Sequence, residues 1–345
     1  MKNVKRIAAI LILAAIWATI AAGCGKNGSE ATVVSSGGAE VKKPQQVNIG
    51  ILNGLSSTSL ILASKKGFLK EEFEKEGIKV NEVWITSGGG PAIVNAMESN
   101  SINVGGMADQ PAIQAAANGG TEKIVGVYSQ SDKYVQLVVP TGSAAKSIKD
   151  LKGKKITVGI GTVGHRVLFA MLKANGMNPE DVEILNTPEG NLLTTFASGF
   201  ADAAVTSEPT ASKLELDGEV KVIGDTQGIK TNYTVLVSTG EFLKEYPEQV
   251  KTFLRAVKRA IDFLNDPANH EEAVKLLAES AEVSPAVVEK ALPKFSFDAG
   301  ISDDAMSSFQ ESADTMYSME IIRKQVKAED FVDRSFVEAL GYQKK

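Results

Sequence analysis

From residue 47 onward, short apolar runs of strand length alternate with longer stretches that place their apolar residues on one helical face. Residues 47–52 and 78–86 are typical of buried strands, and residues 59–76 between them predict an amphipathic helix that ends at Gly77. The alternation continues with an expected helix at 88–100, strand at 102–108, helix at 111–120 and strand at 123–130. Strands that alternate with helices indicate βαβ units, so the pattern predicts an α/β fold.

The same order of elements returns after residue 139. The expected strands and helices alternate at 155–161, 165–176, 181–187, 190–199, 201–207, 209–216 and 220–225. Residues 97–109 and 196–208 correspond, because each segment ends a helix, continues as a short strand and finishes on a carboxylate, Asp109 or Glu208. This structural repeat predicts two equivalent α/β lobes.

The pattern changes after Tyr233. A strand at 233–239 is expected to cross back, and amphipathic helices follow at 241–265, 271–280, 285–292, 303–319 and 328–340. These helices are expected to pack mainly on the first lobe. We therefore predict lobe 1 at 47–138, lobe 2 at 139–233, and a return strand with C-terminal helices at 234–345. The crossings near 137–142 and 233–238 would form a hinge.

The N-terminus has the pattern of a secretory signal at 1–23. Lys2, Lys5 and Arg6 precede an almost wholly apolar run at 7–22. A permanent membrane anchor is the alternative, although the run is at the short end of the ~17–25 residues that a spanning helix needs. "AAGC" resembles the lipobox of bacterial lipoproteins, which implies lipidation of Cys24, the single cysteine, and cleavage before it. Residues 24–46 are rich in Gly, Ser and charge, and predict a flexible tether.

Charge and composition exclude several functions. The chain has a formal net charge of −5, and loss of the three cations in 1–23 would make it more acidic. Such a chain lacks the basic surface expected for nucleic-acid binding. Only two histidines are present, and a lipidated Cys24 leaves no His/Cys pair for a metal or a nucleophile. We therefore expect no catalytic residue, no metal and no cofactor.

Two glycine-rich turns stand between a strand and a helix. "GIGTVG" at 159–164 matches the dinucleotide pattern, and Glu183 follows about 20 residues on. However, Glu183 falls early in its strand, and the chain reads as exported, so NAD binding is disfavoured. "TSGGGPA" at 86–92 is a second such turn in the other lobe. Helix N-termini at both turns would clamp an anion; ordinary tight turns without a ligand are the alternative.

Several stretches together resemble the nitrate/sulfonate/taurine-type substrate-binding proteins of ABC importers, within the NMT1/THI5-like superfamily. They are "SGGGPAIVNAMESNSINVGGMADQPAIQAAANGG", "IKDLKGKKITVGIGTVGHRVLFAML", "MNPEDVEILNT" and "FASGFADAAVTSEPTASKLE". The resemblance implies a type II periplasmic-binding-protein fold, with two α/β lobes, a hinge and a ligand cleft between them. It also implies capture of a small anionic solute and delivery to permease subunits with their ATPase.

The resemblance places ligand contacts at the first-lobe turn, the two glycine-rich turns and the carboxylate strand ends. With Gln110 beside Asp109 and His165 after the second turn, the expected residues are Ser56, Ser57, Thr58, Gly89, Gly90, Asp109, Gln110, Thr162, Val163, His165 and Glu208. His165 could instead cap its helix. Ser207 stands where sulfonate and nitrate members commonly have Trp, which predicts a roomier pocket.

Asp109 and Glu208 are expected to face each other across the cleft and to suit a solute with an amine beside its anionic group. The alternative is that each caps the helix that follows, since a proline lies just beyond both.

Three functional classes remain open. The favoured one is a monomeric, lipid-anchored solute receptor on the extracytoplasmic face of the membrane, at the cell surface or in the periplasm. An enzyme related to the pyrimidine-precursor synthases, or an NAD-binding oxidoreductase, is the second. A ligand-sensing surface lipoprotein without a permease is the third.

Overall fold

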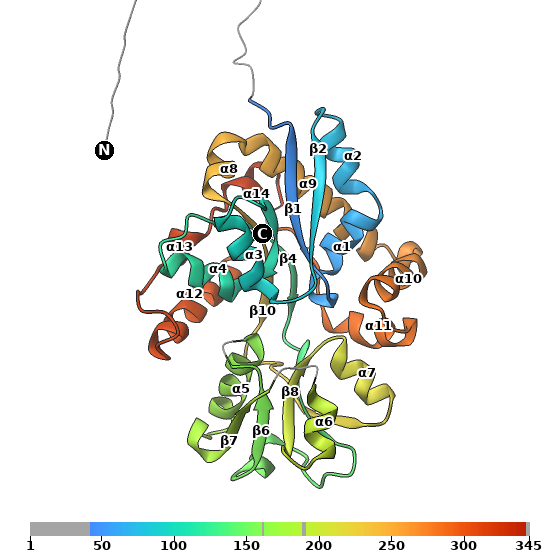
Figure 1. Cartoon of the computed structure of the whole chain (residues 1–345), viewed down its shortest axis with the longest axis vertical. Coiled ribbons are helices and arrows are strands. Elements are labelled where there is room, and N and C mark those ends of the chain that lie inside the picture. The colour runs from blue at the N-terminus through green and yellow to red at the C-terminus, as the bar shows by residue number, and fades with distance from the viewer. Residues whose placement is uncertain (1–41, 161, 188–190, 343–345) are drawn as a thin grey trace, which may run out of the picture. The chain divides into compact units, whose positions relative to one another are not determined.

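The computed structural model describes residues 42–160, 162–187 and 191–342. The predicted signal peptide, Cys24 and most of the predicted tether lie outside the described residues. Residues Lys42–Lys345 form one compact unit, which contains two five-stranded sheets (Figure 1). The expected α/β fold is confirmed.

The first sheet has the strand order β2-β1-β3-β10-β4. Its strands are β1 (Gln46–Leu52), β2 (Lys79–Ile85), β3 (Val104–Ala108), β4 (Lys123–Ser131) and β10 (Asn232–Ser238). β1 is parallel to β2 and β3, whereas β10 is antiparallel to β3 and β4. The sheet is therefore mixed rather than purely parallel, because β10 enters it from the second sheet and so runs in the opposite direction.

The second sheet has the order β7-β6-β8-β5-β9 and repeats this topology. Its strands are β5 (Val135–Pro140), β6 (Lys155–Val158), β7 (Glu183–Asn186), β8 (Ala203–Ser207) and β9 (Val220–Gly224). β6 is parallel to β7 and β8, and β5 is antiparallel to β8 and β9. The two orders match strand for strand, with β5 in the place of β10. The chain passes between the sheets twice, from β4 to β5 and from β9 to β10.

In the part of the chain that the structure describes, seven helices follow the strands of the two repeats. They are α1 (Thr58–Lys65), α2 (Phe68–Glu74), α3 (Gly89–Glu98), α4 (Asp109–Ala117), α5 (Val163–Ala174), α6 (Leu192–Ala197) and α7 (Thr210–Leu216). The single helix expected at 59–76 is two helices, so this prediction was wrong in detail. Gly67 between them has φ 75°, a left-handed conformation that glycine adopts at no steric cost and that ends α1.

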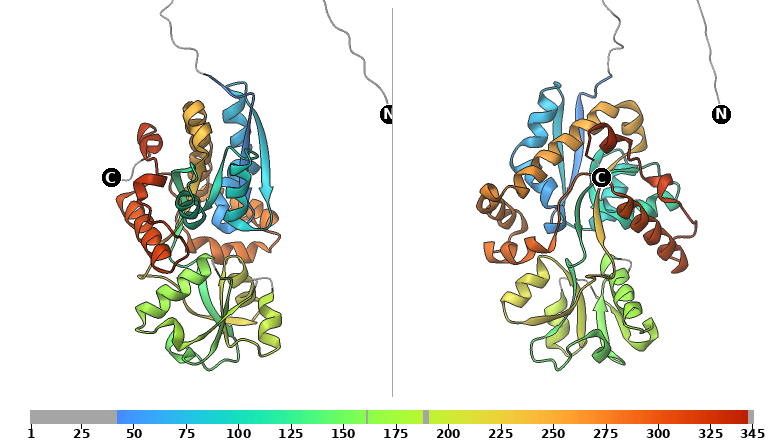
Figure 2. Two further views of the ribbon diagram at one scale, coloured as in Figure 1. Left: turned by 60° about the vertical axis from the view of Figure 1, so that its left-hand side comes forward. Right: turned by 180° about the vertical axis from the view of Figure 1, so that it is seen from behind.

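The C-terminal helices are more numerous than the sequence pattern suggests. They are α8 (Gly240–Glu245), α9 (Pro247–Asn265), α10 (His270–Ala281), α11 (Pro285–Ala291), α12 (Asp303–Ser318), α13 (Ala328–Phe331) and α14 (Ser335–Ala339). α9 contacts α1 and α2, α12 contacts α4, and α14 contacts β4. Both views of Figure 2 accordingly show the orange and red helices around the blue and teal elements of the first sheet. α11 also contacts α7, which belongs to the second sheet.

Short 3-10 turns complete the elements, at η1 (Leu55–Ser57), η2 (Ile148–Leu151), η3 (Pro179–Asp181), η5 (Pro267–Asn269) and η6 (Leu292–Lys294). Apolar residues of the strands fill the core: Val47, Ile49 and Ile51 of β1 are fully buried. Among the described residues, we find no helix with both the length and the apolar character needed to cross a bilayer.

Candidate ligand-binding site

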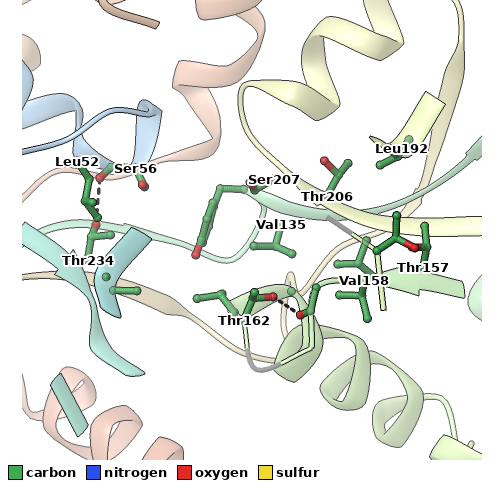
Figure 3. A pocket seen from close by; sticks show the side chains of 18 residues that line it. Leu52, Ser56, Val135, Thr157, Val158, Thr162, Leu192, Thr206, Ser207 and Thr234 are labelled. Atoms are coloured by element: carbon green, nitrogen blue, oxygen red, sulfur yellow. Dashed lines mark hydrogen bonds between the residues drawn. The ribbon is translucent and has the colours of Figure 1, made fainter. Parts of the chain in front are cut away.

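A cavity of about 340 Å³ lies between the two sheets and receives residues from both (Figure 3). Leu52, Ser56 and Thr234 approach it from the first sheet, and Thr157 and Thr206 from the second. Eight of the described lining residues carry a hydroxyl: Ser56, Tyr134, Thr157, Thr162, Thr187, Thr206, Ser207 and Thr234. The other lining residues that the structure describes are apolar or glycine, so no charged side chain is among them.

On the first-sheet side, the Thr234 hydroxyl is held by hydrogen bonds to the backbone. The Thr234 hydroxyl donates to the carbonyl oxygens of Ser56, at 3.2 Å, and Ser129, at 3.1 Å. Gly90 lies in the first turn of α3, where a Cβ would stand 2.4 Å from Cγ of Pro111. Glycine is therefore required there by close packing between α3 and α4.

On the second-sheet side, the N-terminus of α5 lies at the cavity wall. Thr162 caps this helix, since its hydroxyl oxygen accepts from the His165 amide at 3.4 Å. The same hydroxyl donates to the Gly159 carbonyl oxygen at 2.6 Å. Thr162 and Val163 line the cavity, so the first turn of the helix brings amide groups without an intrahelical partner to the site. The Thr162 proton is already engaged, and the hydroxyl therefore positions the turn.

Thr157 is a site residue that the sequence analysis missed. It is in β6, its exposed fraction is 3%, and its hydroxyl has no hydrogen-bond partner in the structure. A buried hydroxyl without a partner is costly, and such groups need an explanation. Because Thr157 lines the cavity, we expect a polar ligand to supply the missing partner. The sequence signal is weak, since Thr157 is a single threonine between the apolar residues Ile156 and Val158 of a short strand.

The predicted contact residues fall into three groups, and those of the first group line one of two neighbouring cavities. Ser56, Gly90, Thr162 and Val163 line this cavity together. A second cavity beside it, of about 420 Å³, is lined among others by Gly89, Gln110 and His165.

Ser57 and Thr58 form the second group and are fully buried. The Ser57 hydroxyl is 3.3 Å from the Tyr128 hydroxyl, and the Thr58 hydroxyl donates to the Leu55 carbonyl oxygen at 2.6 Å. Neither lines the cavity; both hold the turn that presents Ser56.

Asp109, in the third group, is 1% exposed and pairs with groups of the protein. Its Oδ2 accepts from the Ser312 hydroxyl at 2.9 Å, and its Oδ1 is 4.0 Å from a terminal nitrogen of Arg166. Arg166, itself buried, donates to Asn232 Oδ1 at 2.6 Å. In the amide orientation that satisfies both groups, the Gln110 oxygen accepts from Arg166 Nε and, at 2.9 Å, from the same terminal nitrogen.

Glu208 completes this group and is also occupied within the protein. Its side chain accepts from the Ser212 amide at 3.1 Å and the Ser212 hydroxyl at 3.0 Å, and it contacts the Lys294 ammonium. The bond to the Ser212 amide satisfies the first turn of α7. Neither Glu208 nor Asp109 is among the residues that line the 340 Å³ cavity. For Glu208, this geometry favours the alternative in which the carboxylate caps the helix that follows. Asp109 makes no such capping bond and is instead paired with Ser312 and Arg166.

His165 is half-buried, and burial lowers the pKa of its imidazole, which favours the neutral ring at pH 7. The ring packs edge-on against Phe169, with 4.7 Å between ring centroids. Glu183 is the first residue of β7, whereas the cavity lies at the carboxyl ends of the parallel strands β6 and β7. A ribose-binding acid belongs at that carboxyl end, so Glu183 does not fit a dinucleotide site. Among the described residues, no cluster of His, Cys, Asp or Glu could hold a metal ion.

A hydroxyl-lined cleft between two α/β sheets that are joined twice defines a solute-binding protein with the periplasmic-binding-protein fold. The chain belongs to the NMT1/THI5-like family, whose sequence profile matches residues 55–270. This membership confirms the resemblance drawn from the sequence.

Three known proteins show the likeness in detail. The chain is 29% identical to a putative aliphatic sulfonates-binding protein of Bacillus subtilis (strain 168), over 95% of each chain. It is 28% identical, with a TM-score of 0.74, to the alkanesulfonate-binding protein SsuA of Xanthomonas axonopodis pv. citri bound to MOPS, covering 85% of this chain and 99% of that one. The fold is shared with SsuA of Escherichia coli, at 22% identity and a TM-score of 0.76, over 84% and 97% of the two chains. All three bear the names of binding proteins, and the prediction that the chain is not an enzyme is confirmed.

Proposed function

We propose that this protein is the extracytoplasmic receptor of an ABC importer and that it captures a small sulfonate in the 340 Å³ cavity. The observation that carries the proposal is the cavity lining, which combines eight hydroxyl-bearing residues with the N-terminal turns of α3 and α5 and includes no described charged side chain. Hydroxyl and amide donors suit the three acceptor oxygens of a sulfonate, and helix N-termini favour negative charge. The sulfonate-binding names of the relatives agree with this chemistry.

The carboxylates at the strand ends give a cationic solute no free counter-charge. Asp109 and Glu208, the carboxylates at the strand ends, are each paired with a cation of the protein. They therefore offer little attraction to an amine, which is the reason to expect a plain sulfonate to bind at least as well as taurine. A solute held by donors of both sheets would favour the closed arrangement of the lobes by its differential affinity.

Delivery to a permease with its ATPase, as a monomer held at the membrane by a lipid on Cys24, completes the proposal. The charged start, the apolar run and "AAGC" support the lipid. Metabolic labelling with palmitate should mark the wild-type protein and leave Cys24→Ser unlabelled. Label in both proteins, or in neither, would contradict the anchor without touching the binding site.

The binding proposal is tested by calorimetry and thermal unfolding with a panel of ethanesulfonate, taurine, nitrate, acetate, ethylamine and the uncharged analogue ethanesulfonamide. Ethanesulfonate should bind and raise the melting temperature, since a ligand at 100 times its Kd stabilises the folded state by about 2.7 kcal/mol. Ethanesulfonamide is the matched control, because it keeps the size and removes the charge. A preference for ethylamine or for the sulfonamide would contradict the proposal.

A further inference from the structure

Another cavity, of about 710 Å³, lies at the second crossing between the lobes, and the proposed function makes no use of it. Residues 229–231, which lead into β10, line one side, and α12 lines the other. Four of the α12 residues that line it are three or four positions apart and so share one helix face: Asp304, Ser307, Ser308 and Glu311. This polar face turns toward the crossing, where the Ser308 hydroxyl donates to the Thr231 carbonyl oxygen at 3.4 Å. We call this space the hinge cavity.

Tyr233 brings to the hinge cavity a hydroxyl group that the fold does not satisfy. Tyr233 lines the cavity with an exposed fraction of 6%, and its hydroxyl has no hydrogen-bond partner among the described residues. The oxygen is not fully enclosed by protein atoms either, so it opens into the cavity. Phe309 packs edge-on against the ring, at 5.4 Å between centroids, and fixes its position. Polar groups of buried residues normally have a partner, so this hydroxyl is suited to a ligand that supplies one.

Two further polar side chains at the hinge cavity lack partners. Gln130 lies opposite Tyr233 in the pairing of β4 with β10, so both side chains are on one face of the sheet, and the Gln130 amide makes no hydrogen bond with the described residues. Asp304, exposed in the first turn of α12, likewise makes no ion pair and no side-chain hydrogen bond with them. Burial and, after it, the charge of Asp304 raise the pKa of Tyr233, which places this carboxylate near a protonated hydroxyl.

The charges around the hinge cavity favour a cation. Three carboxylates line it, those of Asp303, Asp304 and Glu311, against the one cation Lys230 among the described lining residues. The Lys230 ammonium is engaged by Glu311 at 2.5 Å, and Asp303 is paired with Arg334 at 2.7 Å, so the charge of Asp304 is left without a partner. One unpaired carboxylate among neutral oxygen acceptors suits an ammonium group, which carries one charge and three N–H donors.

We propose that the hinge cavity is a second binding site, and that it takes a small solute with a primary ammonium group. The ammonium donates to the Tyr233 hydroxyl oxygen and the Gln130 amide oxygen and faces the Asp304 carboxylate. The hydroxyls of Ser307 and Thr231 remain for a polar substituent. The hinge cavity has no described lining residue in common with the 340 Å³ cavity, so this site is independent of the proposed sulfonate site.

Titration calorimetry with ethanolamine on the wild-type protein, at low ionic strength, tests this proposal. Ethanolamine should bind in the presence of saturating ethanesulfonate, because the two sites are separate. Two matched ligands should bind much more weakly: ethylene glycol keeps the size and removes the charge, and choline keeps the charge and removes the N–H donors. Sodium and magnesium chloride, titrated alone, show whether a metal ion is preferred to the ammonium group.

Tyr233→Phe should weaken ethanolamine binding by about 10- to 150-fold, the range for loss of one hydrogen bond to a charged group. It should not lower the stability of the protein, because the hydroxyl has no partner there. Asp304→Asn should weaken binding by up to about fivefold, since an exposed ion pair contributes little. Tyr317→Phe is the matched control, because Tyr317 is exposed on the same helix and does not line the hinge cavity.

All three variants should keep the wild-type Kd for ethanesulfonate. The proposal is overturned if ethanolamine does not bind, if it competes with ethanesulfonate, or if choline or a metal ion binds as well as ethanolamine does. It is also overturned if Tyr233→Phe binds ethanolamine with the affinity of Tyr317→Phe. None of these outcomes changes the case for the sulfonate site, which rests on its own titration.

Discussion

At the scale of single residues, the site depends on one hydroxyl group that the fold leaves without a partner. The hydroxyls of Thr162 and Thr234 are bonded to backbone groups and hold local geometry. Thr157 differs, because its hydroxyl is buried at the cavity wall and makes no hydrogen bond. Burial of an unpaired polar group reduces stability, so a ligand that pairs with it recovers free energy on binding. The Thr157 hydroxyl therefore lowers the stability of the ligand-free protein and is expected to raise its affinity for a polar ligand.

We predict that Thr157→Val weakens ethanesulfonate binding and does not lower the stability of the ligand-free protein. A hydrogen bond to a charged group is worth about 1.5–3 kcal/mol, which corresponds to a loss of about 10- to 150-fold in affinity. Valine keeps the branched shape and removes a polar group that had no partner. Calorimetry gives the affinity, and urea unfolding gives the stability.

Thr252→Val is the control for this prediction. Thr252 is equally buried, but its hydroxyl is paired with the Glu76 carboxylate and with the Glu248 carbonyl oxygen, the latter at 3.0 Å. Thr252 is in α9, which is not among the elements that line the cavity. It should lose stability and keep its affinity. The prediction fails if Thr157→Val unfolds more easily than wild type or binds ethanesulfonate equally well.

At the scale of elements, the two sheets are held together by a pair of matching ion pairs. Asp109 follows β3 and Glu208 follows β8, and these strands occupy the same place in the two sheet orders. Asp109 is paired with Arg166, on a helix of the second sheet. Glu208 is paired with Lys294, on a segment joined to β4 of the first sheet through the backbone pair Gln130–Ser296. Each carboxylate thus takes its cation from an element of the other sheet.

We predict that Arg166→Met lowers the free energy of unfolding by about 3–5 kcal/mol, because it leaves the buried Asp109 carboxylate without a counter-charge. The double variant Arg166→Met/Asp109→Leu should recover most of this loss, since no unpaired charge then remains. A double-mutant cycle by urea denaturation, completed with Asp109→Leu, measures the coupling. Lys213→Met provides a control of the same kind, because Lys213 pairs with Asp217 and both side chains are about half exposed, at 53% and 50%. A cycle in which the two losses simply add would show that the pair is not coupled.

At the scale of the whole molecule, the proposed function requires the two lobes to move about the segments that join β4 to β5 and β9 to β10. The cavity wall takes residues from both sheets, so a bound solute interacts fully only when both sides are in place. A ligand shifts the equilibrium between open and closed arrangements only by its differential affinity for them. The Asp109–Arg166 and Glu208–Lys294 ion pairs join the two lobes, so they favour the closed arrangement, as a bound solute does.

We predict that saturation with ethanesulfonate reduces the radius of gyration measured by X-ray scattering. Thr157→Val, at the same ligand concentration, should show a smaller reduction in proportion to its lower occupancy, and both proteins should give the same curve without ligand. An unchanged radius of gyration, under conditions where calorimetry shows full occupancy, would contradict closure.

The sequence determined the elements and their repetition. Strands and helices have different hydrophobic periods, so the alternation of apolar runs from residue 47 was enough to predict an α/β fold, and the match between 97–109 and 196–208 predicted the equivalence that the two sheet orders show. The glycine-rich turns also revealed the helix start that lines the cavity, because such a turn is a local feature. The helix break at Gly67 is also a local feature, because a glycine inside a helical pattern can end the helix.

Only the tertiary structure decided what the polar side chains do. Asp109 and Glu208 have the strand-end positions of ligand contacts, yet their partners Arg166 and Lys294 are 57 and 86 residues away along the chain, and no local pattern relates them. Thr157 is one threonine among several, and its missing hydrogen bond depends on every neighbour that could have supplied one. Secondary structure follows from short-range periodicity, whereas charge pairing and polar satisfaction depend on which distant segments the fold brings together.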